Sequence, residues 1–238
     1  VLASEVSLTP ISIAGHSLGE YTALVASGSL SFFEAVKLVR KRAGLMQAAV
    51  PSGSGSMAAI LGLDDAKVVE ICSIANEVGV VEAVNFNSPG QVVIAGEKKA
   101  VVHACELMKE AGAKRALVLP VSVPSHCSLM KDAAMDFKHS VETINFQMGS
   151  EKVLHNVDAD YSGNVEEIKS KLVEQLHKPV LWTSIVQEMK SSGVEKLIEA
   201  GPGKVLAGLT RRIDKSLSGS AIIDVTSLKS TIEEISNA

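Results

Sequence analysis

The chain has 238 residues, 46% of them hydrophobic and 21% charged, which is enough to bury a substantial core in one domain, alone or carrying an insert. Its net charge of -4 and aromatic content of 3% argue against a nucleic-acid surface, which needs a basic face and usually stacking rings. We therefore expect a globular protein with no nucleic-acid partner.

The cysteines form an odd set at wide spacing: Cys72, Cys105 and Cys127. This pattern favours neither a disulfide framework nor a paired metal site, so we expect no bound metal. No apolar run approaches the roughly 20 residues that span a bilayer, and the start of the sequence lacks the basic-then-apolar order of a signal peptide. These features predict a cytoplasmic protein with no membrane partner.

The first elements are predicted to be a strand, a tight turn and two helices. Residues 10–14 (PISIA) indicate a short buried strand that ends on Gly15, and LGEYTALVAS after it has helical spacing. A second helix is predicted over 32–49, because Pro51 and the SGSGS run at 52–56 end the pattern. We interpret that run of small residues as a domain crossing.

Residues 55–123 follow the order strand, helix, strand, strand, helix, strand, which is the ferredoxin-like pattern. About 70 residues suffice for such a module, so we interpret it as an inserted subdomain. Strands and helices alternate beyond it: helix 127–141, strands near 152–157, helices 165–177 and 180–192, a strand in EKLIEAG, and a helix from Pro202. This alternation predicts an α/β core made of 1–54 and 124–238, with 55–123 inserted into it.

The stretch GHSLG at 15–19 matches the nucleophile elbow GxSxG, in which glycines permit a strained strand-to-helix turn that exposes the serine hydroxyl. The strand before it and the helix after it are the context that the motif requires. We therefore predict that Ser17 is a nucleophile and that the free Leu18 amide supplies half of an oxyanion hole. The alternative is that Ser17 serves only as a helix N-cap, although the two roles are compatible.

Such a serine needs a general base, and six histidines are available. Three lie in helical patterns rich in Lys and Glu, where a solvated face is expected: His103, His139 and His177. His16 can line a pocket, with its ring directed away from Ser17, and His155 suits a structural partner near a strand end. His126 is the predicted base, because the two prolines of PVSVPSHCSLM rigidify the chain where it leaves the inserted subdomain. The alternative is a helix-start histidine without chemistry.

A triad in the α/β-hydrolase order would place an acid between Ser17 and His126. No carboxylate there is convincing, since Asp64 and Asp65 suit the dipole at a helix start and the others lie mainly on predicted helix surfaces. We therefore predict a Ser-His dyad that is oriented by an amide or a carbonyl.

Two polar side chains fall on apolar helix faces. Projected at about 100 degrees per residue, Arg42 lies in the arc that holds Leu38 and other apolar residues. An inward Arg needs an anion, which is either an internal carboxylate or a substrate carboxylate held by its fork, and the pattern favours neither. Gln175 lies beside Ile168 and Leu172, and a buried amide also needs a partner.

Four stretches together resemble the malonyl-CoA:acyl carrier protein transacylase family and cover nearly the whole chain in the family's order: GHSLGEY at 15–21, NFNSPGQVVIAG at 85–96, GAKRALVLPVSVPSH at 112–126 and GPGKVL at 201–206. The resemblance implies an α/β-hydrolase-like core with a parallel sheet and a ferredoxin-like insert. It implies that Ser17 is the acylated nucleophile and His126 its base. It also implies that Arg42 holds the malonyl carboxylate and that the Gln175 carbonyl orients the histidine.

The implied reaction transfers a malonyl group from malonyl-CoA to the phosphopantetheine thiol of acyl carrier protein through a malonyl-serine, in fatty acid biosynthesis, with no bound cofactor. Asn85, Asn87 and Asn156 match polar residues near the family's cleft, where pocket lining and loop capping are equally expected. Because carrier proteins are acidic and this chain is net negative, we expect a basic docking patch at Lys114 and Arg115, with an ordinary solvated pair as the alternative.

Members of that family begin with a strand and a GQGSQ-type loop whose glutamine donates the second oxyanion-hole amide, and this sequence starts after that segment. Removing one oxyanion donor typically costs about 10²- to 10³-fold in rate. We therefore do not expect full activity of the isolated chain unless the segment is supplied elsewhere. Two rival functions follow: a serine hydrolase or thioesterase, and a catalytically impaired fragment that binds carrier protein or a partner subunit.

Overall fold

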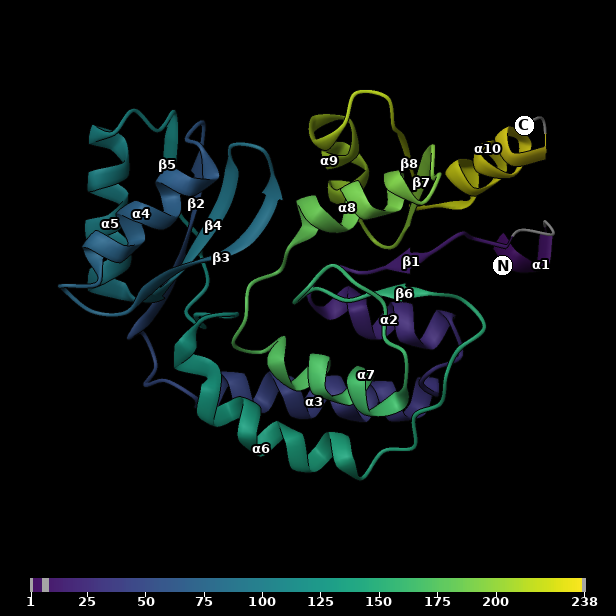
Figure 1. Cartoon of the computed structure of the whole chain (residues 1–238), viewed down its shortest axis with the longest axis horizontal. Coiled ribbons are helices and arrows are strands. Elements are labelled where there is room, and N and C mark those ends of the chain that lie inside the picture. The colour runs from purple at the N-terminus through teal and green to yellow at the C-terminus, as the bar shows by residue number, and fades with distance from the viewer. Residues whose placement is uncertain (1, 6–8, 237–238) are drawn as a thin grey trace. The chain divides into compact units, whose positions relative to one another are not determined.

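The structure is a computed structural model that describes residues 2–5 and 9–236. The chain forms two compact units, one made of residues 13–185 and the other of residues 1–12 and 186–238. Together they have an α/β fold, with parallel pairs of strands in both units and an antiparallel sheet in the larger one (Figure 1).

The larger unit begins with a short parallel sheet and the helices that pack around it. β1 (Ile13–Ala14) pairs in parallel with β6 (Val153–Leu154). The helices of this part are α2 (Leu18–Ala26), α3 (Phe32–Ala48), α6 (Lys131–Glu142) and α7 (Val165–Glu174). Figure 1 shows α3, α6 and α7 side by side, and their apolar faces share one core with α2: Tyr21, Leu24, Leu38, Phe137 and Leu172 belong to it.

The direction of Arg42 follows from how α3 forms. Ser31 begins the helix, since its side chain accepts a hydrogen bond from the Glu34 amide at 3.3 Å. The residues buried on α3 are spaced by three and four, as expected for one helix face: Ala35, Leu38, Arg42 and Met46. The predicted inward direction of Arg42 is therefore confirmed.

The same unit contains a four-stranded antiparallel sheet in the order β3 (Val81–Ser88), β4 (Gln91–Glu97), β2 (Gly55–Leu61), β5 (Arg115–Val118). Two helices, α4 (Asp65–Ala75) and α5 (Lys98–Glu110), connect its strands and cover one of its faces (Figure 1). Along the chain this part reads strand, helix, strand, strand, helix, strand, as predicted. Its core is aliphatic and includes Ile60, Val68, Ile94, Val101 and Met108.

The opposite face of this sheet anchors the segment that follows His126. Four apolar residues pack there around Cys127: Met57, Val84, Val93 and Ala95. The Ser128 backbone N–H also donates to the Glu82 carboxylate of β3 at 3.0 Å. The sheet therefore fixes the chain immediately after the predicted base.

Some predicted elements of this unit are shorter in the structure. The strands expected at 10–14 and 152–157 form only the two-residue pair of β1 and β6. The helix expected over 127–141 begins as a 3-10 turn, η1 (Ser128–Met130), and continues as α6. These differences arise at element ends, where periodicity is least informative.

The helices around Gln175 also end and begin differently from the prediction. α7 ends at Glu174 instead of residue 177, which leaves Gln175 at its C-cap. α8 (Trp182–Ser191) begins after the predicted residue 180, because Val180 is extended against β3. The Val180 N–H donates to the Val84 carbonyl at 2.8 Å.

The smaller unit holds a second parallel pair, β7 (Lys196–Ala200) and β8 (Ser218–Ile222). Its helices are α1 (Leu2–Glu5), α9 (Val205–Ile213), which starts later than the predicted Pro202, and α10 (Val225–Ser236). α8 runs across the boundary between the two units. Within 2–5 and 9–236, no helix is both long and apolar enough to cross a membrane.

Candidate active site

The turn between β1 and α2 holds Ser17 in a strained conformation, with φ 52° and ψ -105°. The turn is tight because the chain passes close to itself: a Cβ on Gly15 would lie 1.9 Å from the carbonyl carbon of Gly19. Only glycine fits at residue 15. A Cβ on Gly19 would meet nothing within 4 Å, so the two glycines of the motif have different reasons to be there.

The Ser17 hydroxyl does not cap α2, although Ser17 occupies the N-cap position. Its Oγ lies 2.8 Å from His126 Nε2, so the side chain is directed toward the predicted base. The capping alternative is therefore wrong for the side chain. The Leu18 amide, at the first position of α2, has no acceptor in the part of the chain that the structure describes.

His126 is buried and has the left-handed backbone conformation, with φ 67°. Its Nδ1 lies 2.6 Å from the main-chain oxygen of Gln175. Because a carbonyl oxygen only accepts, Nδ1 carries the proton and Nε2 presents its lone pair to the Ser17 hydroxyl. Burial, with a smaller contribution from the Arg42 charge, lowers the pKa of His126 to about 3. The ring is thus neutral at pH 7 and able to accept a proton.

Arg42 is buried, and its Nη2 donates to Ser17 Oγ at 3.0 Å. The guanidinium carbon lies 5.7 Å from the centre of the Tyr21 ring, and Nε has no partner among the described residues. None of the carboxylates that the structure describes forms an ion pair with Arg42, so the internal-carboxylate alternative is wrong. A buried cation that lacks an anion lies against the nucleophile.

Two side chains from later in the sequence hold the backbone of the nucleophile turn. Asn156 is buried; its Oδ1 accepts from the Ser17 amide and its Nδ2 donates to the Gly15 carbonyl, each at 2.7 Å. Gln175 Nε2 donates to the Ser17 carbonyl at 3.0 Å. Of the two alternatives for Asn156, the structure favours bracing of the loop. Gln175 contacts both halves of the dyad, the serine through its side chain and the histidine through its carbonyl.

Glu20 is a buried residue that the sequence prediction missed, and the expectation that the carboxylates lie on helix surfaces is wrong for it. Its Oε1 lies 2.7 Å from His155 Nδ1, and its Oε2 accepts from Gln175 Nε2 at 2.7 Å. His155 therefore has the structural partner expected of it. The signal was available, because Glu20 lies four residues before the buried Leu24 and so on the same face of α2.

Three further polar residues lie along β3 and the turn. His16 Nε2 is 2.9 Å from Asn87 Oδ1, and the His16 ring lies 5.7 Å from the Trp182 ring. Burial lowers the pKa of His16, so this ring is also neutral at pH 7. Asn85 has a buried Oδ1 without a partner among the described residues. Trp182 was not singled out in the sequence, where one buried aromatic gives no signal of function.

The remaining predicted residues lie away from the dyad. Lys114 and Arg115 are exposed where β5 begins. His139 is exposed, while His103 and His177 are only partly exposed. No group of three or more metal-ligating side chains occurs within residues 2–5 and 9–236. The three cysteines are buried and free.

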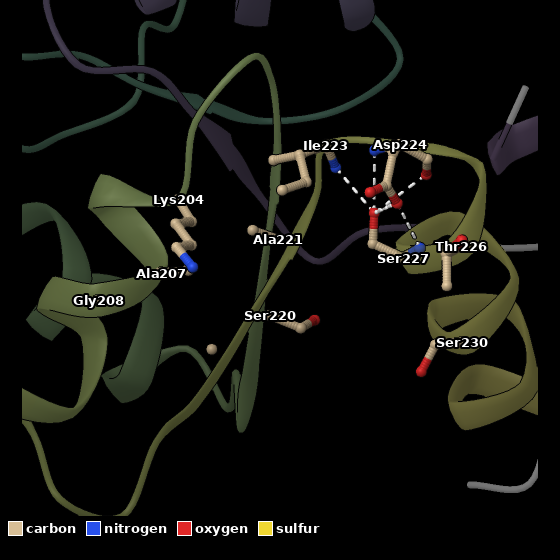
Figure 2. A pocket seen from close by; sticks show the side chains of 11 residues that line it. Lys204, Ala207, Gly208, Ser220, Ala221, Ile223, Asp224, Thr226, Ser227 and Ser230 are labelled. Atoms are coloured by element: carbon tan, nitrogen blue, oxygen red, sulfur yellow. Dashed lines mark hydrogen bonds between the residues drawn. The ribbon is translucent and has the colours of Figure 1, made fainter.

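A hollow of about 490 Å³ lies in the smaller unit, between α9, β8 and α10 (Figure 2). Two of its polar residues form the start of α10, where the Ser227 backbone N–H donates to Asp224 Oδ1 at 2.7 Å. Figure 2 shows these two side chains bonded to each other at the edge of the hollow. Neither Ser17 nor His126 lines this hollow.

Known proteins that resemble this chain along nearly its whole length are acyl transferases. The model of the acyl transferase domain family matches residues 2–230. The malonyl CoA-acyl carrier protein transacylase of Escherichia coli strain K12 is 52% identical over 224 residues, which are 94% of this chain and 72% of that protein. This chain belongs to the malonyl-CoA:acyl carrier protein transacylases, within the acyl transferase family.

Solved structures of transacylases have the same fold. The acyl carrier protein S-malonyltransferase from Vibrio cholerae is 54% identical, with a TM-score of 0.92 over 94% of this chain and 73% of that chain. A malonyl-transacylase solved in complex with its type II PKS acyl-carrier protein is 49% identical, with a TM-score of 0.94 over 95% of this chain and 74% of that chain. The transacylase described here is thus an acyltransferase in which a Ser-His pair lies beside a buried arginine.

Proposed function

We propose that this transacylase moves a malonyl group from malonyl-CoA to the phosphopantetheine thiol of an acyl carrier protein, in fatty acid biosynthesis, through a malonyl ester on Ser17. The observation that carries the proposal is Arg42, a buried cation without a carboxylate partner that donates to Ser17 Oγ. An acetyl group would leave that cation unpaired, whereas the free carboxylate of a malonyl group supplies the missing anion.

In the first half of the reaction, Ser17 Oγ attacks the thioester carbonyl while its proton passes to His126 Nε2. The negative charge that develops on the carbonyl oxygen is stabilised by the Leu18 amide at the start of α2. The carbon–sulfur bond then breaks, and His126 returns the proton to the departing coenzyme A sulfur. The Gln175 carbonyl holds His126 in the tautomer that this transfer requires.

The second half is the reverse with a different thiol. His126 takes the proton of the phosphopantetheine thiol, whose sulfur attacks the malonyl ester, and the carbon–oxygen bond to Ser17 breaks as Oγ regains the proton. No redox step or bound cofactor enters this sequence. Because the malonyl carboxylate pairs with Arg42 at every stage, the group stays in position between the two thiols.

Around this centre, we assign the substrate side of the site to His16, Asn85 and Asn87. The neutral His16–Asn87 pair and the unpartnered Asn85 Oδ1 support polar contacts to the substrate without an added charge. For the carrier protein we propose the exposed Lys114 and Arg115, because an acidic partner needs a local basic patch on a net-negative chain.

We also propose a domain organisation for the chain. Residues 1–54 and 124–238 form an α/β-hydrolase-like core, and residues 55–123 form a ferredoxin-like subdomain. The antiparallel order β3, β4, β2, β5 with two helices on one face supports the second part. We place the protein in the cytoplasm, where its proposed substrates are.

The experiment that tests this function follows a radiolabelled malonyl group from malonyl-CoA in the presence of holo acyl carrier protein. Transfer predicts label on the carrier protein, and Ser17→Ala should abolish it. Label that appears only as free malonate would instead assign the protein to the serine hydrolases or thioesterases, which share the Ser-His pair. Binding of carrier protein without any release of coenzyme A would assign it to the non-catalytic alternative.

A further inference from the structure

Glu20 is the centre of a buried hydrogen-bond network that reaches both halves of the dyad. Its carboxylate accepts from three donors: His155 Nδ1 at 2.7 Å, the Asn156 backbone N–H at 3.2 Å and Gln175 Nε2 at 2.7 Å. Beyond the first of these, His155 Nε2 lies 2.9 Å from Ser162 Oγ. Glu20, His155, Asn156 and Gln175 are all at most 1% exposed, so water cannot replace any of these partners.

Two of the three donors also hold the nucleophile turn. Asn156 contacts the Ser17 amide and the Gly15 carbonyl, and Gln175 contacts the Ser17 carbonyl. The backbone of Ser17 is therefore hydrogen-bonded on both sides by residues that Glu20 holds in place. Since Ser17 has a strained φ of 52°, the surrounding contacts must maintain its conformation.

The same network also reaches the base. The main-chain oxygen of Gln175 accepts from His126 Nδ1, while the Gln175 side chain donates to Glu20. One residue thus connects the orientation of the histidine to the turn that carries the serine. A shift of the Gln175 side chain would change the distance between Ser17 Oγ and His126 Nε2.

We propose that Glu20 is a positioning residue of the transacylase, which aligns Ser17 with His126 through Asn156 and Gln175. The Glu20 carboxylate does not touch the reacting atoms, since its hydrogen bonds go to His155, Asn156 and Gln175, and the Glu20 backbone N–H donates to the Ser17 carbonyl, at 3.1 Å. Its task is to accept hydrogen bonds at fixed places, and not to supply charge to the reaction. This inference rests on the proposed function, because it takes Ser17 to be the nucleophile.

Two substitutions separate the length of this side chain from its charge. In Glu20→Gln the new amide oxygen can accept from Asn156 and Gln175. The new amide nitrogen can donate to His155 Nδ1, because the His155 proton can move to Nε2 and be donated to Ser162 Oγ. Every partner is kept and the charge is lost. In Glu20→Asp the charge is kept, but the shorter side chain cannot reach His155 and Gln175 together.

The test measures kcat and KM for malonyl transfer and the rate at which a fluorophosphonate modifies Ser17. We expect Glu20→Gln to stay within about threefold of the wild type, and Glu20→Asp to lose about 10- to 100-fold in kcat and in modification rate, with KM little changed. Val141→Ala, a cavity in the same core without a hydrogen bond to the network, controls for loss of stability. Its kcat should stay near that of the wild type even where its thermal midpoint falls.

The inference is overturned if Glu20→Gln is as slow as Glu20→Asp, which would indicate a role for the charge. It is also overturned if Glu20→Asp reacts like the wild type. The same holds if Val141→Ala loses as much rate as Glu20→Asp when the two variants have equal thermal midpoints. Failure of the proposed function has a different signature: the wild type would then pass no malonyl group to holo acyl carrier protein, whatever the rate at which the fluorophosphonate modifies Ser17.

Discussion

Arg42 donates a hydrogen bond to Ser17 Oγ across 3.0 Å, from a helix face that is otherwise apolar. Burial of a cation without an anion is unfavourable, and here the unpaired cation lies beside the atom that carries the acyl group. The unfavourable free energy of burying this cation is offset when the carboxylate of a bound substrate pairs with it. Substrate selection and nucleophile position therefore depend on the same side chain.

Replacing Arg42 should relax the preference for malonyl over acetyl thioesters. Hydrogen bonds to charged groups are worth about 1.5–3 kcal/mol, so Arg42→Met should lower the malonyl-to-acetyl ratio of kcat/KM by about 10- to 100-fold. The exposed neighbour Lys41 provides the control, since Lys41→Met removes one charge from the same helix outside the site. An unchanged ratio in Arg42→Met would remove the role assigned to Arg42.

The pH dependence should reveal the neutral His126. The base must be unprotonated to work, and its folded-state pKa is lowered to about 3, so kcat/KM should persist well below pH 6.5 and decline only as the pH approaches the lowered pKa. Arg42→Met removes a positive charge that contributes to this lowering, so the acidic decline should move to higher pH. Rates of Ser17 modification by an uncharged phosphonate, measured from about pH 3 to 8, check both points. A decline centred near 6.5 in the wild type would contradict the burial argument.

The two glycines of GHSLG should respond oppositely to alanine. Gly15→Ala should destroy the turn, because the added carbon would lie 1.9 Å from Gly19 backbone atoms, so we expect at least a 100-fold loss of kcat or a failure to fold. Gly19→Ala meets open space on a helix and should stabilise the protein, by at most about 1 kcal/mol. Thermal midpoints and kcat of the pair test this. Equal effects of the two changes would show that the crowding at residue 15 does not matter.

Asn156 offers a test of the hydrogen bonds that support the turn. In Asn156→Asp a carboxylate oxygen would face the Gly15 carbonyl that the amide now donates to, at a cost of about 1–3 kcal/mol in the free energy of unfolding. Asn145→Asp is the matched control, since it makes the same chemical change at an exposed residue whose side chain forms no hydrogen bond within the described residues. Denaturant unfolding of both variants gives the comparison, and a stable Asn156→Asp protein would contradict the bracing role.

Much of the fold was predictable from local patterns. The glycines, prolines and apolar spacing around GHSLG and the SGSGS run predicted the elements in order, and the periodicity of α3 predicted an inward Arg42. Element ends were less predictable: Val180 stays extended because it pairs with β3, a contact that nothing near it in the sequence encodes.

The site was predictable only where a residue carries its own signal. Ser17 lies in a motif and His126 follows two closely spaced prolines, so both could be singled out. Glu20 carries a charge in the first turn of a helix, which ordinarily indicates a favourable dipole contact at the surface. Its burial depends on His155, Asn156 and Gln175, which lie more than 130 residues later in the chain. Such a network exists only after folding.

The central claim, a malonyl group carried on Ser17, is tested most directly by the mass of the intact protein after brief exposure to malonyl-CoA. We predict one added malonyl group per chain, located on the peptide that contains Ser17, absent in Ser17→Ala, and removed by holo acyl carrier protein. An unmodified mass in the wild type, or an adduct on another residue, would contradict the account.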